Sequence, residues 1–321
     1  MAGISISIGG TKTIEPKYDM AIIGAGPAGL TAGLYASRAR VNHILFEKLT
    51  IPGGQVVNTE KVENYPGFPD GVGGFELMDY FRKQAEKFET NIVTAGVSKL
   101  TKIEDGFSIE SESGNTSVKS VIIASGASPK KTGAENEEKF IGRGISFCAT
   151  CDAALYKGKT VAVIGGGDAA VEEGMFLTRF AKKVYIIHRR DELRATKILQ
   201  ERAFANDKIE FVWSYVPKKI LGDEFVEGIE LLSRKDNSTK TIELDGIFEY
   251  IGIVPQTDFI HLDGLKFDER GFIITDAEMR TNIDGVFAAG DVRSKLLRQI
   301  STAVGDGATA EFSAEKFIEN S

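Results

Sequence analysis

Two cysteines carry the most distinctive chemistry in the chain. Cys148 and Cys151 are separated by two residues, and the sequence has no other cysteine. Pairs with this spacing cycle readily between dithiol and disulfide. Zinc would need further ligands, which three scattered histidines do not supply. A structural disulfide closing so short a loop would gain little chain entropy, so the pair predicts redox chemistry.

The residue directly after the second cysteine is an acid, Asp152. A carboxyl group beside a dithiol can serve as proton donor or relay if burial raises its pKa. It can equally cap the amino end of the residues that follow. Spacing alone leaves both interpretations open.

A first glycine-rich turn lies between a short apolar strand and an amphipathic helix. It reads Gly24-Ala25-Gly26-Pro27-Ala28-Gly29. In such a turn the three glycines make the tight bend, admit a pyrophosphate to the backbone and let the helix pack closely on the strand. Glu47 ends the next strand about 20 residues on, where an acid can bind a ribose hydroxyl. A dinucleotide site is the prediction, and an incidental glycine turn is the alternative.

A second glycine-rich turn, Gly165-Gly166-Gly167, is followed by Asp168 and Ala169, and the next strand ends in basic residues. An acid there would repel a 2′-phosphate, whereas guanidinium groups bind it in bidentate fashion. This site is therefore predicted to prefer NADPH over NADH, with a solvated basic face as the alternative. The predicted contacts are Gly165, Gly167, Asp168, Ala169, His188, Arg189, Arg190 and Arg194.

Composition excludes several classes of protein. The net charge of -7 gives no reason to expect nucleic acid, which calls for a basic surface. No apolar run approaches the roughly 20 residues of a membrane span. The first residues lack the charged start and long apolar stretch of a secretory signal. We therefore expect a cytoplasmic protein that binds neither nucleic acid nor membrane and holds no metal.

The chain repeats one plan of strand, glycine-rich turn, helix and strand, each time followed by short alternating strands. Strands alternating with helices predict parallel sheets, hence an α/β fold with two Rossmann-like dinucleotide-binding domains. Gly and Pro mark junctions near 122–133 and 249–258. The tail from Phe267 has no third fingerprint, so we expect it to complete the first domain, with the second inserted into it.

Two dinucleotide domains and one reactive dithiol together suggest a chain of electron carriers. NADPH gives up a hydride, and a flavin can accept it and pass two electrons to a disulfide.

The sequence resembles the low-molecular-weight thioredoxin reductases of bacteria and lower eukaryotes, which are NADPH- and FAD-dependent pyridine nucleotide-disulfide oxidoreductases. The likeness runs from about Tyr18 to the end. Its motifs are GAGPAGLTA, GGQ (53–55), VENYPGF (62–68), ASGA (124–127), CATCD, GGGDAAVEE, HRRDELRA and GVFAAGDV followed by Arg298-Gln299.

The resemblance implies a homodimer with one FAD per subunit. It implies an FAD-binding domain of residues 1–127 and 257–321 around an NADPH-binding domain of residues 128–256 that carries the dithiol. The residues that the family would place around FAD are Gly24, Gly26, Pro27, Ala28, Gly29, Glu47, Gly54, Gln55, Asn64, Gly126, Gly290, Asp291, Arg298, Gln299 and Ile300.

The resemblance also implies a mechanism. Cys151 would lie close to the flavin, Cys148 would attack the disulfide of a thioredoxin, and Asp152 matches the family's acid. The flavin cannot face both the dithiol and the nicotinamide, so the domains would rotate about the two junctions, where Gly126 and Gly252 suit hinges.

Some positions depart from the family pattern. Ala154 and Leu155 stand where members often carry two aromatic residues that help to dock thioredoxin, whereas Arg143 matches a partner-contacting arginine. The residues before Tyr18 have no counterpart. Rival functions are a reductase that takes electrons from another donor such as ferredoxin, and a non-catalytic redox sensor.

Overall fold

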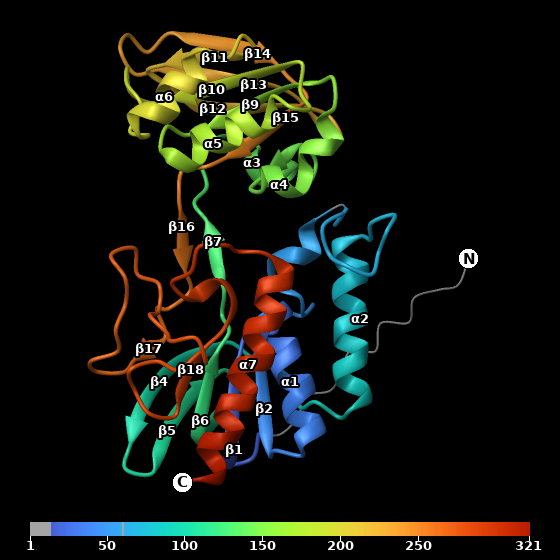
Figure 1. Cartoon of the computed structure of the whole chain (residues 1–321), viewed down its shortest axis with the longest axis vertical. Helices are drawn as coiled ribbons and strands as arrows, with labels where there is room; N and C mark the ends of the chain where they lie inside the picture. The colour runs from blue at the N-terminus through green and yellow to red at the C-terminus, as the bar shows by residue number, and fades with distance from the viewer. Residues whose placement is uncertain (1–13, 60) are drawn as a thin grey trace. The chain divides into compact units, whose positions relative to one another are not determined.

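The computed structural model describes residues 14–59 and 61–321, so most of the segment before Tyr18 lies outside the described residues. The described chain forms two compact units (Figure 1). The first unit contains residues up to Val57, Gly74–Ser128 and Pro255–Ser321, and the second contains Asn58–Gly73 and Pro129–Val254. The sequence did not indicate that the short segment 58–73 would group with the second unit.

The first unit is built on an eight-stranded sheet in which β1 pairs in parallel with β2 on one side and β6 on the other. β3 and β18 extend the parallel part, and β4 and β5 are antiparallel. The strands are β1 (Lys17–Ile23), β2 (His43–Glu47), β3 (Ile92–Thr94), β4 (Val97–Ile103), β5 (Gly106–Ser111), β6 (Gly114–Ile123), β17 (Ile260–His261) and β18 (Val286–Ala288).

Successive residues of β1 enter different cores. Ala21 and Ile23 belong to one hydrophobic cluster, and Met20 and Ile22 belong to another. Because side chains alternate along a strand, the two clusters lie on opposite faces of the sheet. A strand buried on both faces reads as a continuous apolar run, as this one does. The unit's helices are α1 (Pro27–Ala39), α2 (Gly74–Lys87) and α7 (Ile300–Glu319), with 3-10 helices η1 (Gly54–Asn58) and η3 (Gly290–Val292).

The second unit has a five-stranded sheet, wholly parallel, in the order β11-β10-β9-β15-β8. A separate three-stranded antiparallel sheet is formed by β12, β13 and β14. The strands are β8 (Ile145–Ser146), β9 (Thr160–Ile164), β10 (Lys183–His188), β11 (Ile209–Trp213), β12 (Tyr215–Gly222), β13 (Val226–Ser233), β14 (Thr239–Glu243) and β15 (Gly246–Glu249). The helices are α3 (Glu137–Phe140), α4 (Ala149–Asp152), α5 (Asp168–Leu177) and α6 (Lys197–Phe204), with η2 (Ala153–Tyr156).

Each of the two large sheets has a glycine-rich turn after a strand of its parallel part, β1 or β9, and a helix follows that turn. The strands that follow along the chain lie first on one side of β1 or β9 and later on its other side. Loops from both sides therefore meet beyond the carboxyl ends of the strands. The predicted α/β fold with two Rossmann-like halves is confirmed.

Apart from the passages into and out of segment 58–73, the chain crosses between the units through β7 (Ala127–Pro129) and β16 (Ile253–Pro255), which pair with each other. The glycine next to each strand has a left-handed backbone, with φ of +73° at Gly126 and +124° at Gly252. Hydrogen bonds join the crossings at both ends: Lys130 N–H donates to Gly252 O, and Gln256 N–H donates to Gly126 O.

Candidate functional site

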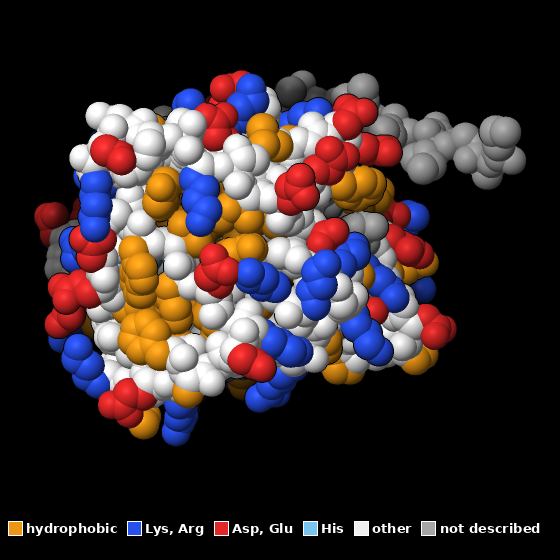
Figure 2. Space-filling model, turned by 90° about the horizontal axis from the view of Figure 1, so that it is seen from above, with side chains coloured by type: hydrophobic (Ala, Val, Ile, Leu, Met, Phe, Trp, Pro, Cys, Tyr) orange, Lys and Arg blue, Asp and Glu red, His pale blue; other side chains and the backbone are white. Residues whose placement is uncertain are grey.

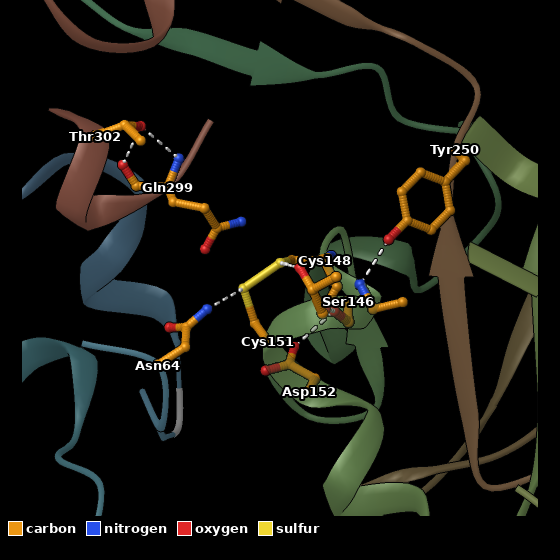
Figure 3. Close-up of a disulfide and its surroundings, with 10 residues drawn as sticks. Asn64, Ser146, Cys148, Cys151, Asp152, Tyr250, Gln299 and Thr302 are labelled. Carbon is orange, nitrogen blue, oxygen red and sulfur yellow. Dashed lines mark hydrogen bonds between the residues drawn. A yellow bond between two sulfur atoms is a disulfide. The ribbon is translucent and has the colours of Figure 1, made fainter. Parts of the chain in front are cut away.

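The two cysteines form a disulfide at the start of a one-turn helix. Cys148 and Cys151 are bonded, with their Cα atoms 5.3 Å apart (Figure 3). Cys148 is the N-cap residue of α4, and Cys151 lies within it. Only Phe147 separates Cys148 from the carboxyl end of β8. The dithiol therefore stands at the same edge of the parallel sheet as the second glycine-rich turn.

Ser146 links the disulfide to the neighbouring acid. Its buried hydroxyl donates to Asp152 Oδ2 at 2.6 Å and accepts the N–H of Cys148 at 3.0 Å. Asp152 makes no side-chain cap for the 3-10 helix that follows it. Its carboxylate instead accepts the serine hydroxyl. One atom, Ser146 Oγ, therefore positions both Asp152 and Cys148.

Tyr250 holds the start of the cysteine helix from the other side. It follows β15 directly, and its hydroxyl accepts the N–H of Ala149 at 2.6 Å (Figure 3). Burial raises the pKa of Tyr250, and the charge of Glu173 raises it further. The phenol therefore stays neutral and hydrogen-bonded beside the dithiol.

Asn64, which the resemblance places around the flavin, lies in the segment that groups with the second unit. Its Nδ2 is 3.9 Å from Cys151 Sγ (Figure 3). That distance is at the outer limit of an N–H···S contact.

The second glycine-rich turn has the form of a nucleotide site. Gly165 has φ of +153°. Gly167 is the N-cap residue of α5 and, as a glycine, has no side chain to occupy the N–H groups of the first turn. Asp168 accepts the N–H of Thr196 at 2.7 Å, and Ala169 is exposed on the first turn of α5. The amino end of the helix is therefore open to an anion.

The predicted basic residues do not form one group. Arg189 and Arg190 are exposed and line a common cavity, whereas Arg194 Nη2 comes within 4.0 Å of a Cβ built on Gly167. His188 is buried against Gly166, and its Nε2 has no hydrogen-bond partner among the described residues. Burial lowers the pKa of His188, and the three arginine charges lower it further.

A pair of acids is buried next to Tyr250. Glu249 ends β15 with only 3% of its surface exposed, and Glu137 lies in α3. Glu137 accepts the N–H groups of Thr132 and Gly133 at 2.7 and 2.8 Å. Burial, and then the Glu137 carboxylate, raises the pKa of Glu249 to about 9. Burial opposes ionisation of Glu137 as well, but the neighbouring Glu249 carboxyl and the hydrogen bonds from Thr132 bring its pKa below the usual value. Glu249 is the protonated member of the pair.

The first unit places its glycine-rich turn in the same way. Gly24 has φ of +103°, and a Cβ on Gly29 would lie 1.7 Å from Gly24 O, so both positions require glycine. A Cβ built on Gly26 would lie 4.0 Å from its closest contact, the Cα of Gly54, so space remains at this position. Pro27 and Ala28 begin α1. Glu47 accepts the N–H groups of Ala25 and Leu49 at 2.7 and 2.8 Å.

Three further predicted positions lie in the same unit. A Cβ built on Gly54 would come 3.4 Å from the Cα of Gly26. The Gln55 amide donates to Ala127 O, and Gly126 follows β6 with open space around it.

The predicted positions near the carboxyl end of the chain meet at η3 and the start of α7. Gly290 packs on Ala28, and Asp291 follows it. Arg298 lies 4.1 Å over the ring of Phe272 and donates to three backbone carbonyls, including Asp291 O at 3.3 Å. Gln299 donates its N–H to Thr302 Oγ1, and Ile300 begins α7 (Figure 3). Arg298 therefore holds the loop that carries Asp291.

Comparison with known proteins gives a consistent result. A family described as pyridine nucleotide-disulphide oxidoreductase matches residues 18–307. A thioredoxin reductase of Listeria monocytogenes is 48% identical over 307 residues, or 95% of each chain.

The chain belongs to the pyridine nucleotide-disulphide oxidoreductase family.

Solved structures agree with this assignment. Thioredoxin reductase from Streptococcus pyogenes matches with a TM-score of 0.90 and 44% identity, covering 95% of this chain and 99% of that one. A ferredoxin-flavin thioredoxin reductase from Clostridium acetobutylicum matches with a TM-score of 0.53 and 32% identity, covering 95% and 99%. Within the oxidoreductase family the chain groups with the low-molecular-weight thioredoxin reductases, which confirms the resemblance seen in its motifs.

Membership in this oxidoreductase family implies FAD and NAD(P)H, and the residues present fit both. In the first unit Asp291 Oδ1 is buried without a hydrogen-bond partner among the described residues, and Lys295 Nζ is 3.9 Å away. Burial raises the pKa of Asp291. Such an oxygen suits a hydroxyl donor of a ligand. In the second unit the unpartnered Nε2 of His188 and the open turn at Gly167 suit a second dinucleotide.

Two further observations concern the described part of this oxidoreductase. None of its helices there is long and apolar enough to cross a membrane. No group of three or more His, Cys, Asp or Glu side chains is arranged to hold a metal ion within residues 14–59 and 61–321.

Sequence reasoning missed Ser146, Tyr250 and Glu249. Ser146 is only two residues from Cys148, and a hydroxyl so close to a reactive pair was an available signal. Tyr250 reaches the same helix from about 100 residues further along the chain, where only the strand order reveals it.

We expect Ser146→Ala to lower kcat for disulfide reduction about tenfold, because a small misplacement of reacting groups is costly. KM for the nucleotide should not change, since the serine ends the outer strand β8, two places from β9 in the sheet. Steady-state kinetics measure both constants. Ser238→Ala, which removes another serine–aspartate bond of the same unit, is the control. Equal losses in the two variants would contradict this role.

We expect Glu249→Gln to flatten the dependence of unfolding free energy on pH. The protonated carboxyl contributes stability that is fully present below its unfolded pKa, near 4.5, and is lost as pH rises toward about 9. The wild-type protein should therefore lose on the order of 1–3 kcal/mol between pH 6 and 8.5 relative to the variant. Urea unfolding followed by Trp213, the single tryptophan, reports on this unit. Parallel pH profiles for the two proteins would contradict the assignment.

Proposed function

We propose that this oxidoreductase is an NADPH-dependent thioredoxin-disulfide reductase. Electrons would pass from NADPH by way of bound FAD to the Cys148–Cys151 disulfide, and from the dithiol to thioredoxin. The disulfide and the names of the relatives support this function. We assign FAD to the first unit and NADPH to the second, with the residues predicted above.

One observation carries the proposal: the disulfide and a basic dinucleotide turn stand at the same edge of one parallel sheet. β8 leads to Cys148, β9 to Gly165 and β10 to His188. A binding protein or sensor would have no need for this combination, because dinucleotide binding alone does not require a dithiol.

The choice of NADPH over NADH rests on the residues that follow β10. Arg189 and Arg190 are exposed there, and no acidic side chain pairs with them among the described residues. Guanidinium groups favour a 2′-phosphate, whereas NADH would be favoured by an acid. The rival donor, ferredoxin, gains some support from the more distant relative. A ferredoxin-dependent enzyme would have no use for these arginines.

A bound flavin supplies the conversion of a hydride into an electron pair. The chain supplies the thiol chemistry. The thiolate of Cys148 attacks the partner disulfide, forms a mixed disulfide and displaces one partner thiolate, which takes up a proton. The thiolate of Cys151 then attacks the sulfur of Cys148, so that the second partner thiol leaves and the internal disulfide forms again.

Asp152 is proposed as the acid that delivers or accepts the proton in these steps. Ser146 would hold it through a hydrogen bond to one carboxylate oxygen. Cys148 and Cys151 are both half-buried, so a partner disulfide can reach the first sulfur. Arg143, Ala154 and Leu155 are exposed nearby in sequence and are candidates for contact with thioredoxin.

We further propose that the two units rotate during turnover, because the dithiol and the nicotinamide are both assigned to the second unit and need the same flavin. The paired crossings β7 and β16 are the proposed hinge, since glycines with left-handed backbone adjoin them. The homodimer and the cytoplasmic location stay predictions, which sedimentation and cell fractionation can test.

NADPH is expected to bleach the yellow flavin of the purified protein and to drive reduction of added thioredoxin, with NADH much weaker. Cys148→Ser and Cys151→Ser should abolish thioredoxin reduction, because each removes one sulfur of the internal disulfide. A thiol reagent measures the product, and absorbance measures the flavin.

Bleaching without thioredoxin reduction would retain the NADPH site and refute the partner. If neither nucleotide bleached the flavin but reduced ferredoxin did, the donor assignment would be wrong. Activity that survived in both cysteine variants would refute the electron path.

Gly252→Ala is expected to slow turnover severalfold while flavin reduction in a single turnover persists, because Ala resists a φ of +124° at the hinge. Gly114→Ala is a matched control, since Gly114 has φ of +123° in a hairpin of the first unit with open space around it. Stopped-flow and steady-state rates distinguish the two effects. Equal slowing in both variants would mean that the hinge has no special part.

A further inference from the structure

A third arginine joins the two that follow β10. Arg189, Arg190 and Arg234 together line a cavity of about 420 Å³. Arg234 follows β13, more than 40 residues further along the chain, and belongs to neither glycine-rich turn nor its flanking motif. Arg194, which the sequence groups with the first two, stands instead beside Gly167.

Backbone hydrogen bonds hold the arginines together. Ser214 N–H donates to Arg190 O at 3.2 Å, and Arg234 N–H donates to Ser214 O at 2.7 Å. Ser214 is buried and has φ of +62°, a left-handed conformation that is uncommon outside glycine. A single residue in an unfavourable conformation, placed between β11 and β12, therefore joins the segments that follow β10 and β13 at this cavity.

Asp191, the acid next to Arg190 in sequence, is bonded to other partners. Asp191 Oδ1 accepts the Ser214 hydroxyl and the Lys235 ammonium group, the latter at 2.9 Å. These two bonds lower the pKa of Asp191, Lys235 being the larger cause. The carboxylate that follows Arg190 in sequence is thus occupied and does not neutralise the guanidinium groups.

Three guanidinium groups around one cavity repel each other unless an anion lies between them. Acidic and basic side chains alternate over much of the face drawn in Figure 2. By contrast, within residues 14–59 and 61–321 no acidic side chain forms an ion pair with Arg189, Arg190 or Arg234. The cavity has the donors and the charge that suit a doubly charged phosphate.

We propose that Arg234 is a specificity-determining residue of this reductase and binds the 2′-phosphate of NADPH together with Arg189 and Arg190. This inference rests on the proposed function, because it takes the nucleotide at the second turn to be NADPH. Arg194, beside the amino end of α5, is then placed for the rest of the nucleotide. Guanidinium groups from the segments after β10 and β13 then contact the phosphate from two parts of the chain. The arginines after β10 alone would contact it from one part only.

Binding of 2′,5′-ADP and 5′-AMP to the holoenzyme, measured by calorimetry, tests this inference. The wild-type protein should prefer 2′,5′-ADP. Arg234→Ala should weaken 2′,5′-ADP about tenfold, the effect of one charge-assisted hydrogen bond, and leave 5′-AMP unchanged. In turnover, KM for NADPH should rise by a similar factor while kcat and KM for NADH stay the same.

Arg202→Ala is the matched control, an exposed arginine in α6 of the same unit that does not line the cavity. It should bind both ligands as the wild-type protein does. The flavin spectrum and thermal unfolding check that Arg234→Ala is folded. An unchanged preference for 2′,5′-ADP in Arg234→Ala, equal weakening of both ligands, or the same loss in Arg202→Ala would overturn the role of Arg234.

Failure of the proposed function gives a different result. If the wild-type protein itself bound 5′-AMP as tightly as 2′,5′-ADP and used NADH as well as NADPH, the NADPH assignment would fall, and the role of Arg234 with it. A preference for 2′,5′-ADP in the wild-type protein that persists in Arg234→Ala refutes only the inference about Arg234.

Discussion

Parallel pairing of β9 with β10 and β15 sends the loops after all three strands to one edge of the sheet. β8 pairs in parallel with β15, so the segment carrying Cys148 arrives at that edge too. In an antiparallel sheet neighbouring strands would end at opposite edges, so His188 and Tyr250, at the ends of β10 and β15, would lie a strand length from the glycine turn after β9. The chemistry of the second unit depends on this one geometric constraint, and the same rule gathers Gly24, Glu47 and Gly290 in the first unit.

The polar groups that support the dithiol and its neighbour Tyr250 are uncharged. Ser146, Tyr250 and Glu249 are buried or follow buried strands, and none of them carries a full charge. Charged groups there would lose much solvation energy, whereas neutral hydrogen-bonding groups fix positions at smaller cost. Asp152 is the acid left at the surface of this arrangement, half-buried beside the cysteine helix.

Local pattern was sufficient where function depends on short segments. The turns at Gly24 and Gly165, the pair Cys148–Cys151 and the basic end of β10 were each predicted from neighbours within one strand–turn–helix unit, and the fold class followed from their repetition. Tyr250 and Arg234 could not be predicted in this way, because they reach their sites through strand order and not through sequence. Segment 58–73 was missed for the same reason, since its grouping depends on contacts with residues far along the chain.

The interruption of the first unit has a consequence for the order in which the protein is made. β18 pairs with β6, and α7 packs on α1, yet Pro129–Val254 of the second unit separate these partners in sequence. During synthesis every residue of the second unit is available once Val254 has emerged, whereas the sheet that begins the chain still lacks β18. Domains generally fold as units as the chain emerges. The part that is translated first is thus the last that can be completed, and it waits with one edge of β6 uncovered until the final residues leave the ribosome.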